Sequence, residues 1–178
     1  MAQLASNDAQ LRGATLTLQL ADTSLPVRGD GVQLQQVVLN LIINALDAVN
    51  PCPPGERQVW VRTQRVEGRV ELVVEDTGVG LSPEARERLF EPFFTTKPAG
   101  LGMGLSISRS ILEVHQGRLQ AEPRPGRGTL FRCSFRPIEA GCPHHRGHSD
   151  HPEPARNEEN VNEAGEVFLA TYMNQGAK

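Results

Sequence analysis

The amino-acid sequence predicts a single domain of the α+β class. Segments 58–66 and 69–77 have the composition of strands and are separated by a Glu-Gly dipeptide, which is typical of a β-hairpin turn. Residues 117–137 read as a second hairpin around a Pro- and Gly-rich turn. Segments 33–48 and 105–116 instead repeat apolar residues with the period of an amphipathic helix. Hairpins and helices together give the α+β class.

The N-terminal part predicts three further features. Residues 1–13 carry a short helical pattern that Gly13 ends, and we expect them to be the end of an element whose beginning is missing. Residues 14–21 alternate apolar and polar side chains, as a half-buried strand does. Pro26 and Gly29 indicate a turn, and Asp30 is a suitable N-cap for the helix that follows.

The remaining elements follow from turn and cap residues. Ser82 and Pro83 predict the start of a short helix that reaches Phe90. Residues 91–104 are too rich in Pro and Gly for a regular element, and this length predicts a functional loop or lid. The polar stretch from residue 139 to 178 predicts a disordered tail, although residues 166–173 are apolar enough for one weak terminal element.

Composition excludes several classes of protein. The chain has 178 residues and a formal net charge of −3, which predicts no bulk affinity for nucleic acid or for a membrane surface. It lacks an uninterrupted apolar run of about 18 residues and an N-terminal signal-peptide pattern. Cys52, Cys133 and Cys142 have no metal-binding spacing, so we expect reduced thiols in a cytoplasmic protein.

The helix predicted at residues 33–48 has an unusual polar stripe. Asn40, Asn44 and Asp47 fall on one line, with branched aliphatic residues on both sides. A buried amide without a partner costs about 1–3 kcal/mol, so these side chains need hydrogen bonds. They either bridge neighbouring backbone groups or face a ligand cavity, where amide oxygens bind a hard cation such as Mg²⁺. The helix by itself leaves both interpretations open.

Two glycine-containing turns suit a nucleotide. Asp76 ends a buried strand, where its carboxylate can accept the amino group of a planar base, and Gly78 and Gly80 let backbone approach the ring. Gly100, Gly102 and Gly104 precede a helix N-terminus, which can bind phosphate oxygens through free N–H groups. A glycine loop alone is more often a flexible loop than a phosphate site, and the sequence contains no P-loop motif.

Four ordered segments resemble the motifs of the ATP-binding domain of bacterial sensor histidine kinases. They are QVVLNLIINALDAV for the N box, EDTGVGL for the first glycine box, LFEPFFTTK for the F box and GLGMGLSISRSI for the second glycine box. The last two are similar to the oxygen-sensor and nitrogen-regulator type of the GHKL superfamily. The resemblance implies a catalytic domain over residues 14–138, preceded at residues 1–13 by the remnant of a dimerisation helix. Its fold would be a two-layer α/β sandwich of the Bergerat type, with a mixed, mostly antiparallel sheet and helices on one face.

The resemblance also implies ligands and site residues. The cofactors would be ATP and Mg²⁺, with Asn44 holding the metal with the help of Asn40. Asp76 would bind the adenine amino group. Phe90, Phe93 and Phe94 would anchor a lid, and Lys97 would either reach the γ-phosphate or remain a solvated surface residue. The remaining nucleotide-binding positions would be Asp47, Gly78, Gly80, Gly100, Leu101, Gly102, Met103, Gly104 and Leu105.

Asn40 separates kinases from hydrolases within the superfamily. Related ATPases of the gyrase, mismatch-repair and chaperone type place a water-activating Glu one turn before the Mg²⁺-binding Asn, whereas this chain has Asn40. An amide cannot act as a general base. The resemblance therefore implies transfer of the γ-phosphate to a histidine on a separate helical domain, and indirectly to a response regulator. Many family members have a basic residue at the position of Asp47. We interpret the acidic residue here as a feature of the subtype.

Two alternatives remain at the sequence level. No segment before residue 14 holds a phosphoacceptor His, so the chain is expected to be a fragment or truncated product, and a free-standing nucleotide-binding module without transfer activity is the alternative function. His115 ends a predicted helix before Gly117, where members of the family often have a structural His-Gly, so we favour a structural role over a phosphoacceptor role for this residue. His144, His145, His148 and His151 belong either to a mobile tail or to a Zn²⁺ or Ni²⁺ site with Cys142.

Overall fold

The computed structural model describes residues 2–97, 100–138 and 166–168. Five strands form one mixed sheet in the order β1-β3-β4-β6-β5. Their bounds are Thr15–Gln19 (β1), Gln58–Val66 (β3), Arg69–Asp76 (β4), Arg118–Pro123 (β5) and Thr129–Phe135 (β6). β1 runs parallel to β3, whereas the other neighbouring pairs are antiparallel.

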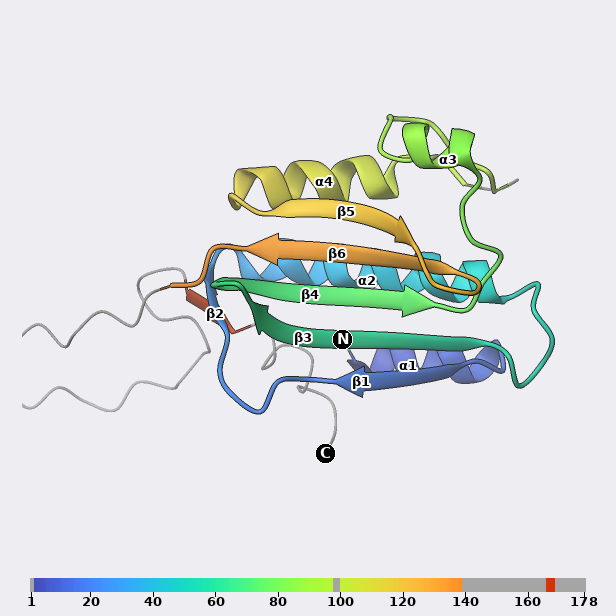
Figure 1. Ribbon diagram of the computed structural model, residues 1–178, viewed down its shortest axis with the longest axis horizontal. Helices are drawn as coiled ribbons and strands as arrows, with labels where there is room; N and C mark the ends of the chain where they lie inside the picture. The colour runs from blue at the N-terminus through green and yellow to red at the C-terminus, as the bar shows by residue number, and fades with distance from the viewer. Residues whose placement is uncertain (1, 98–99, 139–165, 169–178) are drawn as a thin grey trace, which may run out of the picture.

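Helices form the second layer. The bounds are Ala2–Leu11 (α1), Gly31–Val49 (α2), Pro83–Arg88 (α3) and Gly104–Val114 (α4). α1 and α2 lie behind the sheet in Figure 1, and α4 packs against α2 and β5. The predicted two-layer α+β sandwich, with a mostly antiparallel sheet, is confirmed.

The β3–β4 hairpin has the turn that its sequence predicts. Glu67 and Gly68 have φ values of 48° and 75°, and the strands pair from Val66 opposite Arg69. Positive φ at both central residues is the property of a type I′ turn, whose twist matches that of the strands. Glycine adopts this conformation without a steric penalty, which explains the Glu-Gly choice.

The core lies between α2 and the sheet. Asp30 caps α2 because its side chain accepts hydrogen bonds from the backbone N–H groups of Val32 and Gln33. Leu41, Ile42 and Leu46 are fully buried against β3 and β4. Among the described residues, α2 is also the one helix long and apolar enough to cross a membrane by length and composition. Its burial instead identifies it as the core helix of the domain.

Charged side chains cover the opposite face of the sheet. Glu75 forms ion pairs with both Arg62 and Arg124, and the Arg124 guanidinium lies 5.2 Å from the ring centre of Trp60. Arg132 pairs with Glu71 in the same manner at 2.8 Å. The aliphatic stems of such residues exclude water, since the outward-facing Val73 is only 3% exposed.

Two strands differ from the sequence prediction. Residues 26–28, expected in a turn, form β2 (Pro26–Arg28), which pairs antiparallel with β7 (Glu166–Phe168). β7 lies within the apolar stretch predicted to form one terminal element. The other residues of the predicted tail, 139–165 and 169–178, lie outside the described residues. The strand predicted at residues 14–21 is shorter, because only residues 15–19 pair with β3.

Candidate functional site

The predicted motifs meet at one end of the domain. The carboxyl end of β4, the C-terminal half of α2 and the N-terminus of α4 lie together on the right of Figure 1. Polar groups along α2 contact four other segments: Asn40 contacts α4, Asn44 and Asp47 contact Lys97, Asp47 also contacts Arg12, and the Ala48 carbonyl contacts the turn after β4. The polar stripe of α2 therefore organises the site.

Asn40 joins α2 to α4. Its Nδ2 donates a hydrogen bond of 2.9 Å to Oγ of Ser108, a buried residue of α4. A Cβ on Gly104 would lie 2.5 Å from Asn40 Oδ1, so a side chain at this position would have to displace the Asn40 amide. Asn40 therefore agrees with the interpretation in which the amide stripe bridges neighbouring elements. Its Oδ1 faces the start of α4.

Asn44 and Asp47 share one cation. Lys97 Nζ donates hydrogen bonds to Asn44 Oδ1 (2.7 Å) and to Asp47 Oδ2 (2.5 Å). Arg12 at the end of α1 forms an ion pair with the other oxygen of Asp47. Burial raises the pKa of Asp47, but the hydrogen bonds from Lys97 and Arg12 outweigh it and hold this pKa below its usual value. Asp47 is therefore an anion between two cations.

Asp76 is a buried acceptor with one oxygen free. The residue is 1% exposed, and its Oδ1 accepts hydrogen bonds from the backbone N–H groups of Gly78 (2.7 Å) and Thr129 (3.2 Å). Among the described residues, Oδ2 has no hydrogen-bond partner although it is buried. Burial raises the pKa of Asp76 to about 6, against the opposing effect of those two hydrogen bonds. A buried oxygen of this kind takes a donor from an ordered water or from a ligand.

Backbone packs closely around Asp76. A Cβ on Gly78 would lie 2.5 Å from the backbone of Ala48, and the Val79 N–H donates to the Ala48 carbonyl. This contact fixes the turn after β4 against the last turn of α2. Gly80 has a positive φ of 77° and faces the backbone of Gly128. The first glycine box thus lies between α2 and the β5–β6 turn.

The loop after α3 carries the aromatic residues. Phe90 packs against the core, with the Arg109 guanidinium 5.5 Å from its ring centre, and Phe94 is half-buried beneath Arg88. Phe93 does not anchor the loop as expected. Its φ of 67° turns it outward, and it is 75% exposed.

The second glycine box precedes and opens α4. Gly100 donates its N–H to the Lys97 carbonyl, Leu101 is 77% exposed, and residues 98–99 lie outside the described residues. A Cβ on Gly102 would lie 2.5 Å from the Phe93 backbone.

The start of α4 suits an anion. Met103 occupies the N-cap position and supplies no capping side chain. Gly104 begins the helix, and Leu105 packs against the core. The first N–H groups of an α-helix have no partner within the helix, and they favour negative charge.

Sequence reasoning missed three contributors to the site. Arg12 reaches Asp47 from a helix that carried no motif, Ser108 accepts from Asn40, and the Thr129 N–H binds Asp76. Of these three contacts, only the one at Ser108 had a signal in the sequence, because a small polar residue on the apolar face of α4 needs a hydrogen-bond partner. The other two contacts depend on tertiary structure, because Arg12 is an ordinary surface-type residue and the third donor is backbone.

Two other features are separate from this site. His115 Nε2 accepts the Asp30 N–H (2.9 Å) and its Nδ1 lies 2.6 Å from the Ile111 carbonyl, which confirms the structural interpretation of this residue.

Cys52 and Cys133 are free thiols, as expected. The described residues contain no group of three or more potential metal-ligating His, Cys, Asp or Glu residues. The four tail histidines and Cys142 lie outside the described part.

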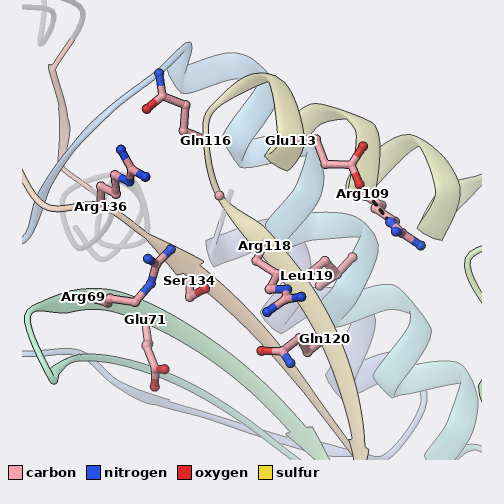
Figure 2. A pocket seen from close by; sticks show the side chains of 11 residues that line it. Arg69, Glu71, Arg109, Glu113, Gln116, Arg118, Leu119, Gln120, Ser134 and Arg136 are labelled. Atoms are coloured by element: carbon pink, nitrogen blue, oxygen red, sulfur yellow. Dashed lines mark hydrogen bonds and ion pairs between the residues drawn. The ribbon is translucent and has the colours of Figure 1, made fainter.

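A concavity of about 570 Å³ lies on the outer face near β5. Arg69, Arg118 and Arg136 surround it in Figure 2, together with the Arg109–Glu113 ion pair of α4. None of the residues predicted to bind nucleotide lines this concavity, so its shape contributes nothing to that site.

Comparison with known proteins places the chain in a family. The family model of histidine kinase-, DNA gyrase B- and HSP90-like ATPases matches residues 29–139, more than half of the chain. Sensor histidine kinase ZraS of Klebsiella oxytoca is 39% identical over 129 residues, which cover 72% of this chain and 27% of ZraS. The chain thus spans about a quarter of the length of this curated relative.

Solved structures are similar over most of the chain. Full-length ShkA in complex with AMPPNP has a TM-score of 0.67 at 29% identity, covering 80% of this chain and 29% of ShkA. Histidine kinase ThkA in complex with the response regulator TrrA has a TM-score of 0.62 at 26% identity, covering 76% of this chain and 37% of ThkA.

Proposed function

The chain belongs to the family of histidine kinase-, DNA gyrase B- and HSP90-like ATPases and carries the ATP-binding catalytic domain of a sensor histidine kinase, and we propose that it transfers the γ-phosphate of ATP to a histidine on a separate helical domain. The observation that carries this proposal is the free, buried Oδ2 of Asp76. It lies at the same end of the domain as the amides of α2 and the uncapped start of α4.

Asp76 fits the adenine base. The exocyclic amino group of adenine is a donor, and the free carboxylate oxygen is a buried acceptor without another partner. The absence of a side chain on Gly78 lets the turn after Asp76 pack directly on the Ala48 backbone, which fixes the position of this turn. An interaction with the carboxylate favours its charged form, so the base and the ionised Asp76 stabilise one another.

Asn44 fits Mg²⁺, and Asn40 supports its neighbours. Asn44 Oδ1 already accepts from a cation, the ammonium of Lys97, so this oxygen points to a place where positive charge is stable. Amide and carboxylate oxygens are the ligands that Mg²⁺ prefers. When bound, Mg²⁺ supplies neutralisation of phosphate charge. The first N–H groups of α4, at Gly104 and Leu105, would hold phosphate oxygens.

The proposed reaction is transfer rather than hydrolysis. Asn40 cannot abstract a proton from water, and its Nδ2 is already committed to Ser108. The chain would bind and orient the nucleotide, and the attacking nucleophile would come from the other domain. Positioning and charge stabilisation account for most catalysis of phosphoryl transfer.

The proposed partners follow from the same comparison. The acceptor would be the helical phosphoacceptor domain of a histidine kinase, and a response regulator would receive the phosphate from it, by analogy with the ThkA–TrrA complex. We place the reaction in the cytoplasm, where ATP is available. No nucleic acid and no membrane contact enter the proposal.

The test has two steps. Calorimetric titration of the full chain with AMPPNP, with and without Mg²⁺, should give saturable binding that Mg²⁺ strengthens. The chain is then incubated with γ-labelled ATP and the isolated helical phosphoacceptor domain of a relative such as ZraS. Label should appear on the acceptor histidine, and an acceptor with that His changed to Ala is the control.

The outcomes separate the candidates. Binding without label transfer to any of several acceptor domains would favour the nucleotide-binding module that acts without phosphotransfer. Steady release of phosphate in the absence of an acceptor would identify a hydrolytic ATPase and would contradict the interpretation of Asn40. No binding by folded protein would reject the proposed function.

A further inference from the structure

The ion pairs around Asp47 extend from α1 to the predicted metal site. Asp8 pairs with Arg12 at 3.0 Å, Arg12 pairs with Asp47, and Lys97 contacts both Asp47 and Asn44. We call Arg12, Asp47, Lys97 and Asn44 the Asp47 hub. It joins three segments that are far apart in sequence: the end of α1, the C-terminal half of α2 and the loop at residues 91–97.

The hub is partly shielded from water. The side chains of Arg12, Asp47 and Lys97 are 28%, 30% and 40% exposed. Arg12 is held from three directions, because its backbone carbonyl also accepts a hydrogen bond of 2.6 Å from Arg57. Each of the two cations thus contacts one oxygen of the same carboxylate, so loss of either leaves Asp47 with a single cationic partner.

Lys97 occupies the oxygen that the proposed function gives to the metal. The ammonium lies 2.7 Å from Asn44 Oδ1. A Mg²⁺ ion binds an oxygen ligand at about 2.0–2.1 Å, so an ion on Asn44 Oδ1 would lie close to the ammonium on the same oxygen. The two like charges would repel each other at that separation, and the ion and the ammonium therefore compete for this oxygen.

We propose that Asp47 is a positioning residue that couples α1 to metal binding: its carboxylate is shared between Arg12 and Lys97, it holds the Lys97 ammonium on Asn44, and Mg²⁺-nucleotide must displace this ammonium. The proposal rests on the proposed function, since it deepens the role of the same site. Its consequence is that a change at the end of α1 alters the affinity of the site for Mg²⁺-nucleotide without contacting the nucleotide.

The first test measures how strongly Mg²⁺ improves ADP binding. ADP is chosen because it has no γ-phosphate for Lys97 to contact. Calorimetry of the full chain gives the ratio of the two dissociation constants, without and with Mg²⁺. In Lys97→Met this ratio should rise roughly two- to fivefold, the range of a partly exposed ion pair. Arg65→Met, which removes an exposed cation of β3, is the charge-matched control and should leave the ratio unchanged.

The second test asks whether Arg12 acts through Lys97. Removing Arg12 leaves Asp47 to Lys97 alone, so Arg12→Gln should tighten the hold on Asn44 and lower the Mg²⁺ ratio. In the Lys97→Met background the same substitution should have no effect. An equal effect of Arg12→Gln in both backgrounds, or a ratio that does not rise in Lys97→Met, overturns the proposal.

A nucleotide-free measurement separates this proposal from the proposed function. Amide hydrogen exchange of residues 93–97 in the full chain should become faster in Asp47→Asn and in Lys97→Met, while exchange in the β3–β4 hairpin stays the same. Unchanged exchange in both variants contradicts the hub. If the wild-type chain binds no ADP yet the exchange changes as expected, the proposed function fails and the coupling of Asp47 to the loop stands.

Discussion

Asp76 combines burial with an incomplete set of hydrogen bonds. Its pKa of about 6 means that burial makes the charged carboxylate costly in the nucleotide-free protein. As pH rises from about 4, the unfolded chain releases this proton before the folded chain does. The free energy of unfolding is therefore expected to fall between about pH 4 and pH 6, and a ligand that donates to Oδ2 recovers part of that loss.

Adenosine affinity should consequently depend on pH through Asp76. At pH 5 about one Asp76 in eleven is ionised if its pKa is near 6, and at pH 7.5 nearly all are. If the ionised form is the one that binds, affinity rises roughly tenfold over this interval. Calorimetry with adenosine is the measurement, because it has no phosphate group that ionises in the same range.

Asp76→Asn is the control for this pH effect. It keeps the shape of the side chain but has no carboxyl group to ionise, so its adenosine affinity should be lower at pH 7.5 and constant with pH. A pH dependence of equal size in this variant would assign the effect to another group. If wild-type affinity does not fall at pH 5 and Asp76→Asn binds adenosine as tightly as wild type at pH 7.5, Asp76 does not belong to the proposed base site.

Single residues differ in how well the sequence predicts their position. Asp76 and Asn44 are accessible to sequence reasoning, because one ends a buried strand and the other lies on a polar stripe between apolar residues. Arg12 is not, since its partner Asp47 is 35 residues away and nothing local distinguishes it from a solvated Arg. Phe93 was expected to be an anchor, but the left-handed backbone at that position depends on close packing against Gly102.

Among the elements, α2 should dominate stability. Adjacent isoleucines provide a matched comparison: Ile42 is 1% exposed and Ile43 is 38% exposed. Ile42→Ala creates a cavity against the sheet and should lower the free energy of unfolding by about 2–5 kcal/mol. Ile43→Ala removes the same atoms from a partly solvated position and should cost less than half as much. Urea unfolding followed by circular dichroism measures both, and equal losses would contradict the assigned face of α2.

Elements with local signals were predictable, and those without were not. The β3–β4 hairpin and the Asp30-capped α2 carry their turn and cap residues in the sequence itself. β2 does not, because Pro26–Arg28 becomes a strand only by pairing with Glu166–Phe168. A three-residue strand is too short to show an alternation of apolar and polar residues, and its partner lies about 140 residues later in the sequence.

The molecule as a whole should tolerate loss of its C-terminal part. Every predicted site residue and the whole five-stranded sheet lie before residue 139. A chain ending at residue 138 should therefore fold and keep its ADP affinity, with a loss of stability below about 2 kcal/mol from the missing β2–β7 hydrogen bonds. A chain ending at residue 168 retains β7 and serves as the control. Urea unfolding and calorimetry test both, and loss of ADP binding in the shorter chain alone would give the C-terminal part a role in the site.

The strand order of the sheet has a consequence for synthesis on the ribosome. The β3–β4 hairpin needs only neighbouring residues, so it can form as soon as residue 76 has left the exit tunnel. The other edge of β4 pairs with β6, which ends at residue 135. During the interval the nascent chain presents an apolar strand edge at residues 72–74 with no partner. Such an edge can pair with another chain, which makes this stage the one where translation speed and chaperones matter most.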